Sequence, residues 1–481
     1  MNTKTPKSAT ILIILLVLLF FNCKSPDDEI VAGPESEIVD KEKNDNEDNT
    51  EEQQIEPIAC EECTHIVNSW KTDGEALDIK PGDIICLDAN QTYSNLLFTN
   101  IVGTQEAPII IKNCGEQVVF INPDNSSYGV KFQYSNNFKL LGNGGGGDYG
   151  IKISTEKGFF LSMQTYTTDF EIANVEIAGK SINKSGFAGI GIKTSPYEDC
   201  ENFTDPSRTS WIMRNIIVRD NYIHDTDGEG LYIGHGFYNG RVESDCTEKT
   251  YSHSIKGVRI YNNLIENVGY DGIQIKNCDA DVKVYNNIIN GYGQKDNGAH
   301  DEGLYIGDGT TGAFYNNKII NGVGTGIQCH GMGNLDIYNN VIVNAGDYAF
   351  FAASGPHVYR FPDGYFNIFN NTFHAEGDKT FAFFGDQGGV KRLKNNILVA
   401  PNASEIARKG VALDSSHNIF TADKTRIKFT NFSEGDFTLK SDSPAVDKGV
   451  DLSEFGITDD ILATGRPQGS GYDLGAYEYK D

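Results

Sequence analysis

The sequence predicts an all-β fold: a single right-handed parallel β-helix, a solenoid with an asparagine ladder and a cap at each end. The first observation is a phrase of apolar residues, one or two asparagines and more apolar residues, which occurs seven times. The last asparagine of each copy is Asn221, Asn263, Asn287, Asn317, Asn340, Asn371 and Asn396. The steps are 42, 24, 30, 23, 31 and 25 residues, and periods of about 20–50 residues are typical of solenoids. The second observation is that β-branched and aromatic runs, broken by Gly and Asn, fill the space between, without helical periodicity.

A second phrase follows each asparagine phrase and sets the register of the coils. A glycine begins a short run in which Ile or Leu alternates with variable residues, as in Gly230-Leu231-Tyr232-Ile233. Alternation of this kind predicts a strand with one face in the core. We expect the repeated glycine at a corner that requires positive φ or has no room for a Cβ. The asparagines are expected to stack as a structural ladder.

The first 22 residues predict an export signal. Lys4 and Lys7 precede an apolar run, Ile11–Phe21, that is too short to span a bilayer. Leu19-Phe20-Phe21-Asn22-Cys23 resembles a bacterial lipoprotein cleavage box, which implies a lipidated Cys23; an ordinary secretory signal is the alternative. Residues 23–58 are polar and acidic and predict a disordered tether. Acids just after Cys23 resemble the surface-export signal of Bacteroidota lipoproteins, which implies an outer membrane lipoprotein facing the extracellular side.

The net charge of the chain limits the kinds of binding partner that we expect. The net charge of −27 argues against nucleic acid, and we expect membrane contact only through the lipid anchor. We expect a monomer, with the β-helix over residues 59–400 and C-terminal coils and a cap over 401–481.

The cysteines give three further expectations. Four of them gather near the start of the fold, and Cys329 falls on an inward position. Cys200 and Cys246 lie at matching positions of two insertions and are predicted to form a disulfide.

The position before the corner glycine carries acids in three consecutive coils. It is occupied in turn by Ala188, Glu229, Asp271, Glu302, Thr325 and Tyr348. Neighbouring strands lie about 4.8 Å apart, so these like charges must be protonated, paired or bound to a cation. We expect a Ca²⁺ site made by Glu229, Asp271, Glu302 and Asp301. Asp227 and His300 lie within three residues of the same corner.

Polar residues of the outward strand positions lie beside this column. They are Tyr232, Gln274, Tyr305 and Gln328 in one row, and Lys276 and His330 in the next. Two insertions, roughly 195–211 and 235–257, leave the coil after these strands and are expected to wall a groove. The predicted catalytic residues are Lys276, His330, Glu302, Tyr305 and Tyr232. The predicted substrate-binding residues are Gln274, Gln328, His235 and Arg241.

The chain resembles β-helix polysaccharide lyases, especially the alginate lyase and chondroitinase B family. Asp227-Gly228-Glu229-Gly230 echoes that family's Asn-Gly-Gly-Glu signature, and His330-Gly331 matches the last two residues of its Arg-His-Gly triplet. The resemblance implies a polysaccharide partner, expected to be acidic, and β-elimination on a uronate. An inverting glycoside hydrolase that uses Glu229 and Glu302, about 9.6 Å apart over two coils, remains open. A glycan-binding lipoprotein without catalysis and a C5-epimerase also remain open.

Overall fold

The structure is a computed structural model. It describes residues 57–480, apart from 122–127, 146, 195–206, 243–246, 248, 354–358, 385–388, 405–406 and 410–411. The chain divides into two compact units, residues 1–45 and 46–481, and everything described belongs to the second. The predicted lipidation site Cys23 and the predicted disulfide Cys200–Cys246 lie outside the described residues. No helix within the described ranges is long and apolar enough to cross a membrane.

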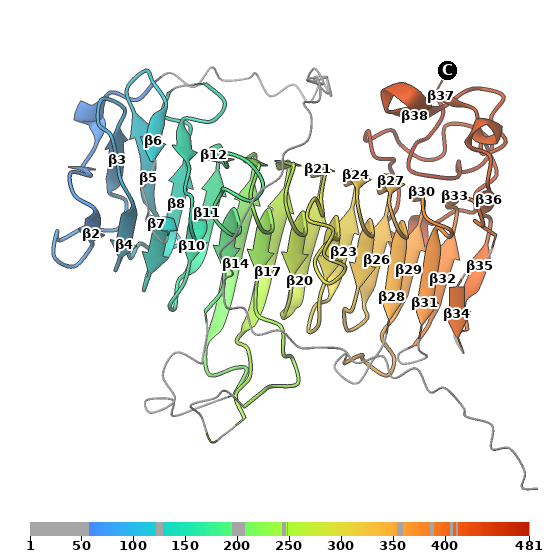
Figure 1. The fold of residues 1–481 in the computed structure, drawn as a ribbon, viewed down its shortest axis with the longest axis horizontal. Helices are drawn as coiled ribbons and strands as arrows, with labels where there is room; N and C mark the ends of the chain where they lie inside the picture. Colours follow the sequence, from blue (N-terminus) through green and yellow to red (C-terminus); the bar gives the residue numbers. More distant parts are fainter. Residues whose placement is uncertain are drawn as a thin grey trace, which may run out of the picture. The chain divides into compact units, whose positions relative to one another are not determined.

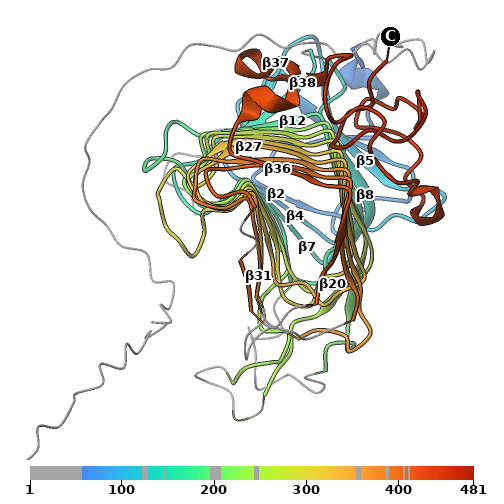
Figure 2. The same cartoon turned by 90° about the vertical axis from the view of Figure 1, so that its right-hand side faces the viewer.

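Three long sheets of parallel strands form the second unit, and the chain visits them in turn, as a right-handed β-helix does (Figure 1). Figure 2 looks along the stack, with β31 of sheet B, β20 of sheet A and β36 of sheet C on three sides. Sheet A consists of β1 (His65–Ile66), β3 (Ile84–Asp88), β5 (Ile109–Cys114), β8 (Asn136–Leu141), β11 (Thr168–Ala173), β14 (Ile212–Arg219), β17 (Ser254–Tyr261), β20 (Cys278–Tyr285), β23 (Gly312–Tyr315), β26 (Leu335–Tyr338), β29 (Phe366–Phe369), β32 (Lys391–Lys394) and β35 (Asp414–Ser416).

Sheets B and C complete each coil. Sheet B consists of β2 (Lys71–Asp73), β4 (Leu96–Thr99), β7 (Tyr128–Gln133), β10 (Phe159–Met163), β13 (Ile190–Ile192), β16 (Leu231–Ile233), β19 (Ile273–Ile275), β22 (Leu304–Ile306), β25 (Ile327–Cys329), β28 (Phe350–Ala353), β31 (Phe381–Phe384) and β34 (Ala407–Lys409). Sheet C consists of β6 (Val119–Ile121), β9 (Ile151–Ile153), β12 (Val175–Ala178), β15 (Tyr222–His224), β18 (Leu264–Glu266), β21 (Ile288–Asn290), β24 (Lys318–Gly322), β27 (Val341–Ala345), β30 (Thr372–Ala375), β33 (Ile397–Val399) and β36 (Ile419–Thr421).

The predicted asparagine ladder is present between sheets A and C. Each ladder asparagine donates its side-chain N–H to the Oδ1 of the next, at 2.9–3.0 Å from Asn221 to Asn396. Asn396 donates in the same way to Asn418, so the ladder has an additional member that the repeated phrase did not reveal. The residue before each ladder asparagine has positive φ, for example 55° at Asn286 and 53° at His417. Asparagine is among the few residues that adopt this conformation readily, which explains the Asn-Asn pairs.

The corner glycines are required for space. None of Gly230, Gly272 and Gly303 is among the positive-φ residues. A Cβ on Gly272 would lie 2.6 Å from the carbonyl oxygen of Gly303 and 2.4 Å from a methyl carbon of Ile289. Of the two predicted reasons for these glycines, close approach is therefore the correct one, and the following Ile and Leu residues enter the core. Cys329 is fully buried in that core, as predicted.

The two ends of the stack are closed differently. At the start, near the 3₁₀ turn η1 (Cys60–Glu62), disulfides Cys60–Cys114 and Cys63–Cys86 join the first coils. At the other end the chain continues through η2 (Lys424–Ile427), β37 (Phe429–Asn431), η3 (Phe432–Glu434), β38 (Asp436–Leu439) and η4 (Ser453–Phe455). This C-terminal segment packs apolar residues such as Phe437 and Leu474 against Val341 and Val399 of sheet C. It therefore covers the side of the last coils.

Candidate functional site

The predicted column of carboxyl groups lies at the corner that precedes sheet B. The N–H of Gly230 donates to the carbonyl of Asp271, and the N–H of Gly272 donates to the carbonyl of Glu302, both at 2.9 Å. Glu229, Asp271 and Glu302 therefore occupy one position in three consecutive coils. Their side chains are buried, with 2%, 0% and 1% exposed. No Lys or Arg in the described ranges forms a salt bridge with them, so their charges lack a cationic partner from the protein chain.

Burial and mutual proximity raise the pKa of the acids in this column. Burial raises the pKa of Asp271 to about 7, and burial together with the charge of Asp271 raises the pKa of Glu302 to about 9. The pKa of Glu229 is raised by burial as well. The backbone N–H of Glu302 donates to Asp271 Oδ1 at 3.1 Å, which holds the two residues in contact. Asp301 is half-buried, and its N–H donates to Glu302 Oε2 at 3.1 Å.

A histidine approaches the column from the segment between β21 and β22. His300 Nδ1 lies 3.9 Å from Glu229 Oε1 and 3.9 Å from Asp271 Oδ2. One donor atom each from Glu229, Asp271 and His300 lies within 4.8 Å of the other two. Of the four predicted metal ligands the structure thus brings together Glu229 and Asp271, while Glu302 and Asp301 lie outside this group of converging atoms. Sequence reasoning placed His300 near the corner but did not assign it a role, because only the folded loop shows which way it turns.

Lys276, Tyr305 and His330, three predicted catalytic residues, form a contact cluster on the outer face of sheet B. The Tyr305 hydroxyl lies 2.9 Å from His330 Nδ1. Lys276 Nζ lies 4.8 Å from the centre of the Tyr305 ring. Burial, with the charges of Arg360 and Lys276, lowers the pKa of His330 to about 4, and burial raises the pKa of Tyr305 well above its usual value. At neutral pH the tyrosine is therefore the donor and the neutral imidazole the acceptor.

A similar lysine–tyrosine contact occurs two coils earlier. Lys193 Nζ lies 4.0 Å from the centre of the Tyr232 ring. Tyr232 is also one of the predicted catalytic residues. In the row of outward residues, Tyr232, Gln274, Tyr305 and Gln328 are direct neighbours in register. Gln274 is only 1% exposed, and neither its Oε1 nor its Nε2 has a hydrogen-bond partner in the described structure. Gln328 is half-buried.

His235 and Arg241, two predicted substrate-binding residues, belong to the insertion after β16. His235 is half-buried, and burial lowers its pKa to about 3, so its ring is neutral at pH 7. Arg241 is exposed, and its guanidinium carbon lies 3.9 Å from the centre of the Phe237 ring. Its backbone pairs with Thr250, which closes the described part of the insertion into a hairpin.

A comparison with protein-family models agrees with the β-helix fold. A family model described as "right handed beta helix region" matches residues 244–397. No curated protein sequence matches the chain. Among solved structures, pectate lyase Pel9A is 13% identical with a TM-score of 0.48, covering 87% of this chain and 97% of its own. The lacto-N-biosidase of family GH136 from Eubacterium ramulus is 12% identical with a TM-score of 0.42, covering 74% of this chain and 67% of its own. At this level of similarity the likeness concerns the fold alone.

Proposed function

We propose that this protein cleaves a uronate-containing polysaccharide by β-elimination on the outer face of sheet B. The observation that carries the proposal is the contact of Lys276, Tyr305 and His330. A cation can neutralise a carboxylate, and a hydroxyl paired with a neutral imidazole can remove a proton, which are two steps that β-elimination needs. The outward row on sheet B also offers a polymer three half-buried side chains beside them, those of Tyr232, Tyr305 and Gln328.

Lys276 is proposed to receive the carboxylate of the uronate. It makes no salt bridge with any acid in the described ranges, although the chain carries a net charge of −27. Because no carboxylate in the described ranges forms a salt bridge with Lys276, its ammonium group is proposed to bind an anion from solution. Neutralisation of the uronate carboxylate makes the neighbouring C5 proton more acidic, which is the first requirement of the reaction.

Tyr305 and His330 are proposed to remove that proton together. The Tyr305 oxygen takes the C5 proton while the Tyr305 hydroxyl proton passes to His330 Nδ1, 2.9 Å away. The electrons of the C5–H bond form the C4=C5 double bond, and the C4–O bond breaks. The departing oxygen takes a proton from water. The relay avoids a free phenolate, which the raised pKa of Tyr305 disfavours.

Hydrolysis by Glu229 and Glu302 has less support. An inverting hydrolase needs one carboxyl at the departing oxygen and the other at a water on the opposite side of the sugar. Both side chains are almost fully buried at the corner, with 2% and 1% exposed. The cluster on sheet B, whose three residues are only half-buried, is better placed for a polymer.

The test is an assay of the purified chain on alginate, pectate, ulvan and chondroitin substrates, followed by the absorbance of the unsaturated product. We expect activity on at least one substrate. Tyr305→Phe and His330→Gln should each reduce kcat by about 10²–10⁴-fold, the usual contribution of a positioned acid or base. Lys276→Met should lower kcat and also raise KM, because the uronate carboxylate is then bound less well and is no longer neutralised. Tyr315→Phe is the matched control, because Tyr315 stacks between Tyr285 and Tyr338 on sheet A.

Three outcomes contradict the proposal. Reducing ends released without the absorbance would indicate a hydrolase. Binding to the polymers without cleavage would indicate a glycan-binding protein. Full activity of Tyr305→Phe would exclude the relay even if elimination is observed.

The location of the protein is a separate proposal that depends on Cys23. We propose that Cys23 is lipidated and tethers the β-helix to the outer membrane, with the acidic segment 24–58 as spacer. Cys23→Ala should then move the protein from the membrane fraction to the soluble fraction. An unchanged distribution would contradict lipid anchoring.

A further inference from the structure

We infer that Glu229, Asp271 and His300 form a binding site for a single divalent cation of the transition-metal class, such as Zn²⁺. The site lies at the corner before sheet B, and the inference does not depend on the elimination chemistry proposed above. It also differs from the sequence-based expectation of an all-oxygen Ca²⁺ site, because an imidazole replaces two of the four expected carboxylates.

Unsatisfied atoms are the first support. Glu229 Oε2, Asp271 Oδ2 and His300 Nδ1 are all buried and have no hydrogen-bond partner. Glu229 and Asp271 are 2% and 0% exposed. A buried carboxylate oxygen without a partner has a large free-energy cost, and each such atom in a folded protein requires an explanation. Here three of them belong to residues that converge on one point.

Distances are the second support. His300 Nδ1 lies 3.9 Å from an oxygen of Glu229 and 3.9 Å from an oxygen of Asp271. These contacts are too long for hydrogen bonds. Atoms bound to one tetrahedral Zn²⁺ at about 2.0–2.1 Å lie about 3.3 Å apart. The three side chains therefore need to approach one another by only about half an ångström to hold one small ion.

Donor chemistry selects the class of ion. Ca²⁺ and Mg²⁺ prefer oxygen ligands, and Ca²⁺ takes six to eight of them. Imidazole nitrogen together with carboxylate oxygen suits Zn²⁺ and its neighbours. Two carboxylates and one imidazole make three protein ligands, the number found in zinc sites that keep an open position. The His300 side chain is 36% exposed, so the site has a solvent-accessible side.

At this location a bound ion would link neighbouring coils of the β-helix. Glu229 and Asp271 precede β16 and β19, and His300 ends the loop that leads into β22. A cation bound to all three connects three consecutive coils and removes the repulsion between two buried carboxylates. Binding should therefore stabilise the fold, which gives a readout that needs no substrate.

The experiment uses the full chain purified without chelators. Elemental analysis should find close to one transition-metal ion per chain. After removal of the metal with EDTA the melting temperature should fall, and Zn²⁺ should restore it, whereas Ca²⁺ and Mg²⁺ should not. Titration calorimetry with Zn²⁺ on the stripped protein should show one site.

Variants test the ligand set. His300→Gln and Glu229→Gln should each weaken Zn²⁺ binding by at least about tenfold, since even changes outside the ligands cost about 10–100-fold in metal affinity. His417→Gln, at an exposed histidine before ladder residue Asn418, is the matched control and should bind as the wild type does. Circular dichroism identifies any variant that has not folded.

The inference would be overturned by any of four results. These are no bound metal and no thermal response to Zn²⁺, a response to Ca²⁺ alone, equal Zn²⁺ affinity in His300→Gln, or loss of affinity in His417→Gln. The wild-type chelation experiment decides the question even if both site variants fail to fold.

Discussion

At the scale of single residues, the two asparagines of the repeated phrase have separate tasks. The first adopts positive φ and turns the chain, as Asn316 does at 55°. The second is buried and joins neighbouring coils through its amide, as Asn317 does between Asn287 and Asn340. The pattern was visible in the sequence because both tasks favour the same residue type. Asn418 was missed because His417 takes the first position there.

Loss of one ladder asparagine should destabilise the protein. Asn317 donates to the carbonyl oxygens of Val284 and Tyr315 and to Asn340, and it accepts from Asn287. Asn317→Ala leaves several buried groups unpaired, each at a cost of about 1–3 kcal/mol. We expect the free energy of unfolding to fall by at least about 2 kcal/mol in urea denaturation. Exposed Asn239→Ala should change it little, and equal effects of the two variants would contradict the ladder's role.

His330 should make both stability and activity depend on acid pH. Burial and the charges of Arg360 and Lys276 hold its pKa at about 4 in the folded protein, against about 6.5 in an unfolded chain. As the pH falls from about 6.5 to 4, the unfolded state binds a proton that the folded state does not. This histidine's contribution to stability therefore decreases across that window and is constant above it.

The same titration predicts the acid limit of catalysis. Neutral His330 accepts the Tyr305 proton, so the acid limb of kcat/KM should lie near pH 4. Lys276→Met removes one of the charges that lower the pKa, and the residual activity should show its acid limb at higher pH. NMR titration of the His330 ring provides an independent measurement. An acid limb near 6.5 in the wild type would contradict the burial of this imidazole.

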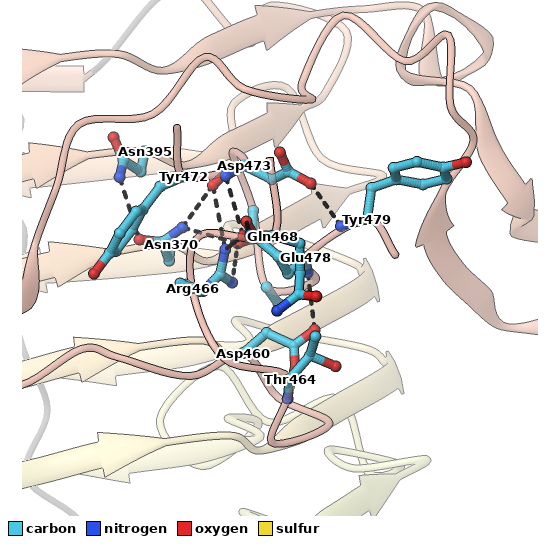
Figure 3. A network of polar contacts seen from close by, with 12 residues as sticks. Asn370, Asn395, Asp460, Thr464, Arg466, Gln468, Tyr472, Asp473, Glu478 and Tyr479 are labelled. Carbon is cyan, nitrogen blue, oxygen red and sulfur yellow. Dashed lines mark hydrogen bonds and ion pairs between the residues drawn. The ribbon is translucent and has the colours of Figure 1, made fainter. Parts of the chain in front are cut away.

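At the scale of elements, the C-terminal segment binds the first asparagines of the last coils. The side-chain N–H groups of Asn339, Asn370 and Asn395 donate to carbonyl oxygens of Asp459, Asp473 and Val450. Figure 3 shows Arg466 beside Glu478, with Asn370 and Asp473 nearby. The sequence predicted C-terminal coils and a cap over residues 401–481, but not the position of the cap along sheet C, because that depends on which coils present apolar residues outward.

Removal of one charge from the Arg466–Glu478 pair should release this segment. Arg466 Nη1 lies 2.7 Å from Glu478 Oε2, and the side chains are 0% and 1% exposed. Arg466→Met leaves a buried carboxylate without its partner, which costs about 3–5 kcal/mol. Limited proteolysis should then cut within residues 440–480 first. The double variant Arg466→Met/Glu478→Gln should recover part of the loss, and Lys428→Met, in an exposed pair with Asp442, should have little effect.

At the scale of the whole molecule, the sequence was sufficient to predict the stack of coils but not to predict all residues of the candidate site. Regular spacing predicted the coils, and register then placed Glu229, Asp271 and Glu302 in one column. It could not show that the column is buried, nor that the segment 291–301 returns His300 to it. Repeats are encoded by local patterns, whereas the loops between them are positioned by contacts distant in sequence. The part of the site that came from loops was therefore the part that was missed.

The alternation of lysine and glycine along sheet B has a consequence for the choice of polymer. The second outward row contains Lys193, Gly234, Lys276 and Gly307. The ammonium group of each lysine lies over the ring of a tyrosine in the next coil. A Cβ on Gly307 would lie 2.3 Å from Lys276 Cγ, so the small residue makes room for the long one. The two lysines are thus two coils apart, roughly 9.6 Å along the stack. We therefore propose that, among the acidic polymers of the assay, those whose carboxylates recur at roughly this spacing bind best.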